Sequence, residues 1–383
     1  MAHPAFLCYN IERYCNARMR IRRRQHARST CYNIERYCDG RMGLMIKEDI
    51  RIKQVIVHIL DSTVGLPVLS DSVIDFGSDF ADFLREHIYR IVAGDDSKDC
   101  EFYKEQSEIY QMMKEYDDDR FVPMSKQAAE LLYGIMNSNI DIPPADLVVV
   151  RFKARDEEFL AFLKMNFKTS YTHRTLSEGE GNYNEIIRYK SILPTETQRL
   201  QEAAVIDLQT FGVRLIEKKY EVNGEKTNYF SYLFLKCSSH LSPKSKLSIV
   251  TKAVENIQKE NCEEYKQYEE HMRAKSIIQE ELAQNGGFVV EEIAEKIFAD
   301  QPELKTAFQE KMEKYDMVKE EVQPQNDTTV RKYQKQYLLT DTGIEIKIPM
   351  DQYKDTGKVE FITQADGSIS VLLKNIGHIQ AKF

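Results

Sequence analysis

The strongest constraint on the fold is the point at which the hydrophobic pattern of the chain changes its period. Before Pro143 and Pro144, apolar residues recur three and four positions apart, as on one face of a helix, most clearly at residues 75–93. After the two prolines, short apolar runs alternate with turn residues, which is typical of strands joined as an antiparallel meander. Helices and strands segregated in this way predict an α+β fold.

The predicted elements follow from these two periods. Short strands are expected at residues 52–60 and 66–69. Helices are expected at residues 75–93, 102–116 and 126–137, the last with Ser125 as its N-cap. Six strands are expected after the prolines, at residues 147–152, 158–168, 185–193, 203–208, 213–222 and 227–235, with a hairpin turn at Asn223-Gly224. From Ser242-Pro243 the chain becomes helical again, and residues 322–329 have the composition of a linker.

The C-terminal region carries the most specific strand signals. Three isoleucines within residues 344–348 alternate with charged residues, the pattern of a half-buried strand. Asp366-Gly367 marks a tight turn between two further strands. A two-residue loop would place Phe361 opposite Leu372, whereas a three-residue loop collects the alternate apolar residues of both strands on one face. Because the buried face sets the register, we predict the three-residue loop.

Segments near both ends of the chain carry a resemblance to a known family. VIVHILD at residues 55–61 and PVLSD at residues 67–71 resemble the opening of the bacterial nucleoid-associated protein family (the NdpA/YejK group). Residues 191–194 and 203–220 are similar to its middle, and the strand, acidic-aromatic linker and hairpin at residues 340–377 resemble its end. The resemblance runs from about Met42 onward. It implies association with the nucleoid and DNA binding, without an assigned catalytic activity.

Basic charge is concentrated at one end of the chain. Residues 1–41 hold nine Arg, no Lys and three acidic residues, whereas the formal charge of all 383 residues is −8. The remainder is therefore strongly acidic, which argues against a DNA-binding surface spread over the whole molecule. Screening confines each basic patch to its own neighbourhood within about 10 Å, so local clusters still matter.

Two windows of the acidic body contain no Asp or Glu, residues 159–177 and 226–254. Their basic side chains are the predicted contacts to double-stranded DNA: Lys164, Lys168 and Arg174 in the first window, and Lys236, His240, Lys244, Lys246 and Lys252 in the second. The helix expected to begin at Ser242-Pro243 would add free backbone N–H groups for a phosphate. The alternative is that these are ordinary solvated faces. Because the sequence shows no base-reading motif, the predicted binding is sequence-nonspecific.

An acidic helical stretch supports a different class of function. Residues 255–281 hold eight Glu and four Lys or Arg. Such a helix usually packs one face and solvates the other, but it can also present acids to a basic partner. The second hypothesis is therefore a protein–protein adaptor that reaches DNA through other nucleoid or DNA-processing proteins. A homodimer is a further expectation, because edge strands such as residues 344–348 need covering.

The sequence offers little support for catalysis. Asp341-Thr342-Gly343 resembles the loop of aspartic proteases, but a single copy would need a homodimer to pair two carboxylates. A turn is the preferred interpretation. His58 lies in an apolar strand and is interpreted as a core residue, and the Gly-rich residues 177–182 as a hairpin tip rather than a phosphate loop. We expect no enzymatic activity, metal or cofactor.

The N-terminal part contains an imperfect duplication. CYNIERYCNARM at residues 8–19 recurs as CYNIERYCDGRM at residues 31–42. The four cysteines are candidate zinc ligands, but the six residues between each pair exceed the two to four usual in structural sites. The preferred interpretation is a duplicated stretch upstream of the true start, at Met42 or Met45.

The predicted organisation has three parts: the basic segment at residues 1–41, disordered or upstream of the start, an α+β domain at residues 42–240, and a helical domain with C-terminal strands at residues 241–383. No run approaches the roughly 20 apolar residues needed to span a bilayer, so no membrane partner is expected. Seven cysteines in a chain of this size favour reduced thiols. The predicted location is the nucleoid, in the cytoplasm.

Overall fold

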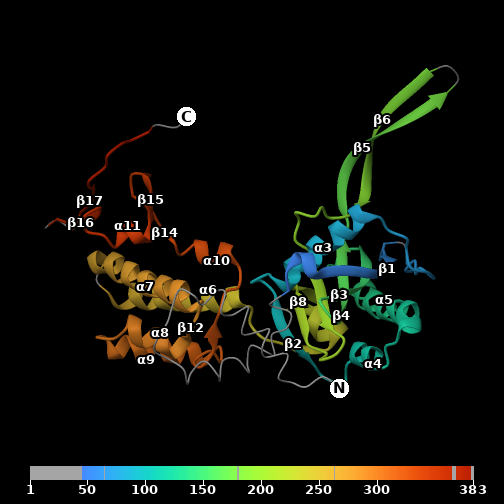
Figure 1. Cartoon of the computed structure of the whole chain (residues 1–383), viewed down its shortest axis with the longest axis horizontal. Helices are drawn as coiled ribbons and strands as arrows, with labels where there is room; N and C mark the ends of the chain where they lie inside the picture. The colour runs from blue at the N-terminus through green and yellow to red at the C-terminus, as the bar shows by residue number, and fades with distance from the viewer. Residues whose placement is uncertain (1–44, 64, 179–180, 263, 365–367, 381–383) are drawn as a thin grey trace. The chain divides into compact units, whose positions relative to one another are not determined.

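The computed structural model describes residues 45–383, apart from residues 64, 179–180, 263, 365–367 and 381–383 (Figure 1). The duplicated N-terminal segment, its four cysteines and the expected start at Met42 lie outside the described residues. The described chain contains both a large antiparallel sheet and several helices, which confirms the α+β prediction. Among the helices described, none is long and apolar enough to cross a membrane.

A seven-stranded antiparallel sheet organises residues 50–239. Its strand order is β1-β3-β4-β7-β8-β2-β11. The strands are β1 (Ile50–Leu60), β2 (Lys98–Phe102), β3 (Ala145–Ala154), β4 (Glu157–Asn166), β7 (Glu202–Asp207), β8 (Val213–Ile216) and β11 (Cys237–Ser239). All six residues of β7 are buried, which shows that both faces of the sheet centre are covered.

Two helices cover the sheet, α3 (Ser78–Val92) and α5 (Phe121–Asn137). Leu147 of β3 belongs to the same apolar cluster as Leu132 of α5. The next residue, Val148, points to the opposite face of the sheet because side chains alternate along a strand, and it is also fully buried. Helix α3 contacts β1, β7 and β8. The two faces are therefore packed by different helices.

Three predictions in this part were wrong in detail. The second short strand is reduced to one bridge between Val68 and Ile59, because the neighbouring Pro67 has no N–H for a ladder. The helix expected at residues 102–116 is only α4 (Glu108–Lys114), since Phe102 ends strand β2 and pairs with β11. Ser125 is not an N-cap: α5 begins four residues earlier, and the Ser125 hydroxyl contacts a buried histidine.

The segment from β8 to β11 mixes confirmed and wrong predictions. Strands β9 (Tyr220–Val222) and β10 (Glu225–Thr227) are joined by Asn223 and Gly224, whose φ angles of 53° and 84° fit the predicted tight hairpin. The strand expected at residues 227–235 is instead a π-helical turn, Phe230–Leu235. Its apolar side chains do not alternate with polar ones as in a half-buried strand, and Phe230, Phe234 and Leu235 enter the core while Tyr232 is exposed.

Helices dominate the next part of the chain. Helix α6 (Pro243–Asn261) begins where predicted, and the Ser242 hydroxyl accepts the N–H of Ser245 at 3.2 Å. Helices α7 (Glu264–Asn285), α8 (Val290–Ile297) and α9 (Pro302–Glu313) pack with α6 around a second apolar core. The expected linker at residues 322–329 is partly structured: it overlaps β13 (Glu321–Val322), which pairs with β12 (Phe288–Val289), and α10 (Asp327–Arg331).

Two hairpins complete the described chain. The first joins β14 (Lys335–Leu339) to β15 (Glu345–Pro349), and α11 (Met350–Tyr353) separates it from the hairpin of β16 (Val359–Thr363) and β17 (Ile369–Leu373). Phe361 lies opposite Val371, which confirms the predicted register. The loop of that hairpin lies outside the described residues. In the first hairpin, Gly343 has a φ of 84°, as its predicted turn requires.

Candidate nucleic-acid interface

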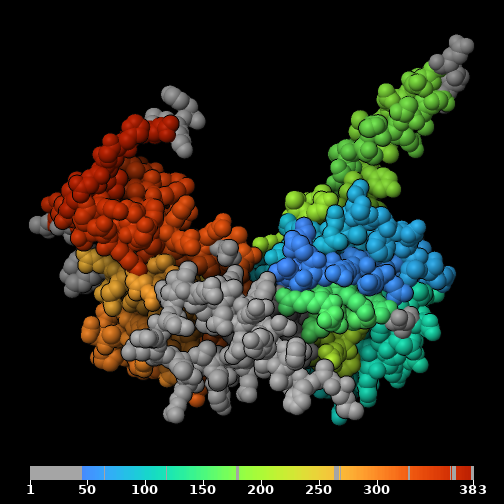
Figure 2. Space-filling model, in the orientation of Figure 1, coloured from blue at the N-terminus to red at the C-terminus, as the bar shows by residue number. Residues whose placement is uncertain are grey.

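A two-stranded ribbon extends from the sheet with most of its side chains exposed. Strands β5 (Lys168–Glu178) and β6 (Gly181–Ile192) pair only with each other and project away from the sheet (Figures 1 and 2). We call this ribbon the arm. Every side chain from Lys168 to Ser177 is exposed. Sequence reasoning placed a strand at residues 185–193 but missed β5, whose residues are polar on both faces and show no buried period.

The two faces of the arm differ in charge. On one face, Tyr171 pairs with Arg188 and His173 pairs with Ile186, and towards the tip Thr and Ser side chains pair with Asn side chains. This face, residues 171, 173, 175, 177, 182, 184, 186 and 188, contains no Asp or Glu, and we call it the basic face. On the opposite face, the guanidinium of Arg174 forms an ion pair with the carboxylate of Glu185.

The basic face also exposes large apolar side chains. Tyr171 and Ile186 are each 71% exposed. A two-stranded hairpin without further packing is only marginally stable in water. The opposite face also exposes large side chains, Leu176, Tyr183 and Tyr189, so the two faces of the arm differ in charge rather than in apolar exposure.

Arg188 and Lys190 provide the positive charge of this region. Both are exposed, and no ion pair to either is found among the described residues. Lys190 lies next to the basic face, where the pairing of the two strands shifts by one residue near Lys168. Lys168 is exposed at the base of the arm, as its predicted role requires. The sequence prediction did not include Arg188 or Lys190, although their position in a strand without buried periodicity was a usable signal.

Lys164 is not available to DNA, and its prediction was wrong. It lies in β4 with no exposed side-chain area, and its ammonium nitrogen is 3.5 Å from a carboxylate oxygen of Glu202. It also donates to the carbonyl oxygen of Pro143 at 3.1 Å. Burial lowers the pKa of Lys164 to about 8, while Glu202 partly restores the charged form. The residue is a buried structural cation.

Three lysines of the second window, residues 226–254, form ion pairs with carboxylates from other parts of the chain. Lys236 pairs with Glu108 at 3.0 Å, Lys244 pairs with Asp96 at 2.6 Å, and Lys246 pairs with Glu320. His240 and Lys252 are exposed without an ion pair among the described residues. The window is therefore not a continuous basic surface, because acids distant in the sequence lie beside three of its lysines.

One of the two residues considered for catalysis is buried in a strand, and the other is exposed in a turn. His58 is buried, and its Nε2 atom lies 3.0 Å from the Ser125 hydroxyl. Asp341 is exposed in the turn between β14 and β15. Within the described ranges, no three His, Cys, Asp or Glu side chains are grouped so that they could hold a metal ion. Cys100 and Cys237 are buried free thiols.

Comparison with known families identifies the class to which this fold and arm belong, that of nucleoid-associated proteins. Specifically, the chain belongs to the nucleoid-associated protein YejK family, whose profile matches residues 56–379. The match includes the seven-stranded sheet from the middle of β1 onward, the arm, the helical part and the C-terminal hairpins, so the resemblance found from the sequence is confirmed. No curated protein matches the chain.

Proposed function

We propose that the protein binds double-stranded DNA directly and without sequence preference, that it has no catalytic activity, and that the basic face of the arm makes the contact. The observation that carries the proposal is the charge of this face: it is exposed, free of acids and bears Arg188, and Lys190 lies next to it. The family supports association with the nucleoid. Residues 42–383 are acidic as a whole, so a local basic element is needed for this part of the chain to approach a polyanion.

The dimensions of the arm suit a DNA groove. Strand β5 has 11 residues, which corresponds to about 36 Å at a rise of about 3.3 Å per residue. This length is close to one turn of DNA, about 34 Å. The major groove is about 12 Å wide and admits a two-stranded ribbon. The Thr, Ser and Asn side chains near the tip offer neutral hydrogen bonds, and Arg188 offers a charged contact to phosphate.

The test compares two double variants that each remove two positive charges. Arg188→Ala with Lys190→Ala changes the arm, and Lys244→Ala with Lys246→Ala is the matched control, because both of its lysines are already paired with carboxylates. Binding to 30-base-pair duplexes of unrelated sequence is measured by fluorescence anisotropy at several salt concentrations. Each lost phosphate contact lowers the slope of log K against log salt by about 0.9, so the arm variant should lose about 2 units of slope.

The control should keep most of its slope and affinity. A wild-type slope of log K against log salt in the arm variant, together with a reduced slope in the control, would indicate that residues 226–254 contact the DNA. This result would refute the proposed role of the arm. Strong preference for one duplex sequence would refute the nonspecific mode.

An acidic adaptor is the second candidate function, and the ion pairs of Lys236, Lys244 and Lys246 favour it. These pairs leave fewer free cations for DNA than the sequence suggested. If the wild-type protein shows no duplex binding even at low salt, where phosphate contacts are strongest, direct binding is excluded and the adaptor remains.

A further inference from the structure

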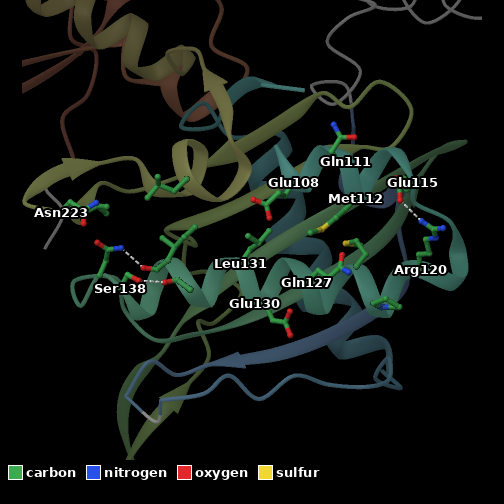
Figure 3. A pocket seen from close by; sticks show the side chains of 17 residues that line it. Glu108, Gln111, Met112, Glu115, Arg120, Gln127, Glu130, Leu131, Ser138 and Asn223 are labelled. Carbon is green, nitrogen blue, oxygen red and sulfur yellow. Dashed lines mark hydrogen bonds and ion pairs between the residues drawn. The ribbon is translucent and has the colours of Figure 1, made fainter. Parts of the chain in front are cut away.

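A wide groove lies on the side of the sheet domain that carries α4 and α5. It has a volume of about 1220 Å³ and is bounded by α4, α5, the β9–β10 turn and the π-helical turn (Figure 3). Its lining follows α5 from Pro123 to Ile135 and continues past the end of the helix to Asn139. At a rise of about 1.5 Å per residue the helical part spans about 18 Å, the length of three to four helical turns. The groove is therefore long enough for a helix rather than only for a small molecule.

The floor of the groove is apolar and adaptable. Met112 and Leu131 lie between the two helices in Figure 3, and Met124, Ile135 and Leu233 continue the apolar lining. Methionine has several rotatable bonds and a polarisable sulfur, so it adjusts to differently shaped apolar partners. An open apolar channel flanked by polar residues is the arrangement with which proteins take up an amphipathic helix.

The rim of the groove is acidic. Glu108 and Glu115 lie on the α4 side, and Glu130 lies on the opposite side (Figure 3). Arg120 is the single basic side chain of the lining, and it is paired with Glu115 at 3.0 Å. Glu130 has no ion pair among the described residues. Glu108 is paired with Lys236, which lies outside the lining. Of the three rim glutamates only Glu130 therefore lacks an ion pair within the described residues, and the remaining negative charge of the rim complements a partner with Lys or Arg beside its apolar stripe.

Gly134 leaves open space on the α5 side of the groove. It lies inside α5, where glycine is unfavourable compared with alanine, and its backbone is an ordinary helical one. A Cβ atom at Gly134 would meet nothing within 4 Å, so no neighbour in this chain requires a glycine. Because Gly134 also lines the groove, its missing side chain leaves room there for another molecule.

We propose that the α4–α5 groove binds an amphipathic helix of another protein, with an apolar stripe on the floor and basic residues facing the glutamates of the rim. This inference does not depend on DNA binding by the arm. It assigns the groove and the arm to different partners, so the protein would hold a second protein while the arm is on DNA.

The test uses the full chain and a labelled synthetic 18-residue peptide. The peptide carries Leu at positions i, i+3, i+4 and i+7 and Lys on both flanks; one comparison peptide has Glu in place of Lys, and another has the same residues in scrambled order. Anisotropy titrations at physiological salt should show the Lys-flanked peptide binding at least about 10-fold more tightly than either comparison peptide.

Gly134→Leu fills the groove and should weaken binding of the Lys-flanked peptide at least about 10-fold. The Tm of this variant should stay equal to or above that of the wild-type protein, because leucine favours helices more than glycine does. Asn256→Leu adds the same side chain to an exposed position of α6 outside the groove, and it should bind as the wild type does. Glu130→Lys should weaken binding of the Lys-flanked peptide and strengthen binding of the Glu-flanked peptide.

Three results would overturn the proposal. One is equal affinity for the ordered and scrambled peptides, which would indicate only attraction between a basic peptide and an acidic protein. Another is unchanged binding in both Gly134→Leu and Glu130→Lys. The third is a wild-type dimer, seen by analytical ultracentrifugation, that Gly134→Leu dissociates, because the occupant would then be a second copy of this chain.

Discussion

Acidification should destabilise the fold through His58, which joins three separate segments. The N–H of Ser70 donates to Nδ1 of His58 at 3.1 Å, and the Nε2 atom lies 3.0 Å from the hydroxyl of Ser125. The Ser125 hydroxyl donates to the carbonyl oxygen of Val122 at 2.8 Å. Nδ1 is therefore an acceptor and the single ring proton sits on Nε2. A second proton would have to go on Nδ1, facing the N–H of Ser70.

The size of the effect follows from the pKa of His58. Burial, with a smaller contribution from Lys126, lowers this pKa from 6.5 to about 4. Because the folded pKa lies below the unfolded one, the unfolded chain takes up the proton first as the pH falls. The contribution is fully present above about pH 6.5 and is lost between about pH 6.5 and pH 4. A difference of about 2.5 pKa units corresponds to about 3 kcal/mol over the whole range, and to about 2 kcal/mol at pH 5.

The assay is urea unfolding of the wild type and of His58→Gln at pH 7.5, 6, 5 and 4. Glutamine does not titrate, so the difference in unfolding free energy between the two proteins isolates His58 from other titrating groups. At pH 7.5 the variant should be less stable, because it loses the fit of the imidazole between Ser70 and Ser125. This difference should shrink by about 2 kcal/mol by pH 5. A difference that stays constant from pH 7.5 to pH 4 would refute the reasoning.

Three further predictions concern stability. Lys164→Ala should lower the free energy of unfolding, measured in urea, by about 3–5 kcal/mol, because it leaves the carboxylate of Glu202 buried without its cation. Replacing both residues by apolar ones of similar volume should lower it much less. Equal losses in the single and the double variant would contradict the buried ion pair. Ser242→Ala should cost about 1 kcal/mol by removing the cap of α6, and Ser242→Thr, which keeps a hydroxyl, should restore most of it. Gly224→Ala should cost about 1 kcal/mol because its φ of 84° is unfavourable for alanine, and an unchanged thermal transition would argue against the tight turn.

Local sequence patterns were sufficient to predict those structural features whose physical cause lies within a few residues of the chain. The start of α6 depends on Ser242 and the proline after it, and the β9–β10 turn depends on Asn223 and Gly224. The register of the β16–β17 hairpin followed from the alternation of its own side chains. The α+β class was predictable for the same reason, because helical and strand periods are each visible in a short window. The family could also be recognised from the sequence, since each segment that carries the resemblance is a continuous stretch of residues.

The candidate site depended on contacts that no short window contains. Lys244 lies in a stretch without acids, yet Asp96, 148 positions earlier, is paired with it. Lys164 resembled a surface cation until the sheet buried it beside Glu202. The basic face of the arm exists only because β5 and β6 pair in one register, which places Arg188 beside Tyr171 and Glu185 on the other side. The sequence by itself determined the α+β class, the start of α6 and the tight turns, because those depend on neighbouring residues. Only the tertiary structure decided which charges remain free, because electrostatic neutralisation depends on distance in space and not on distance along the chain.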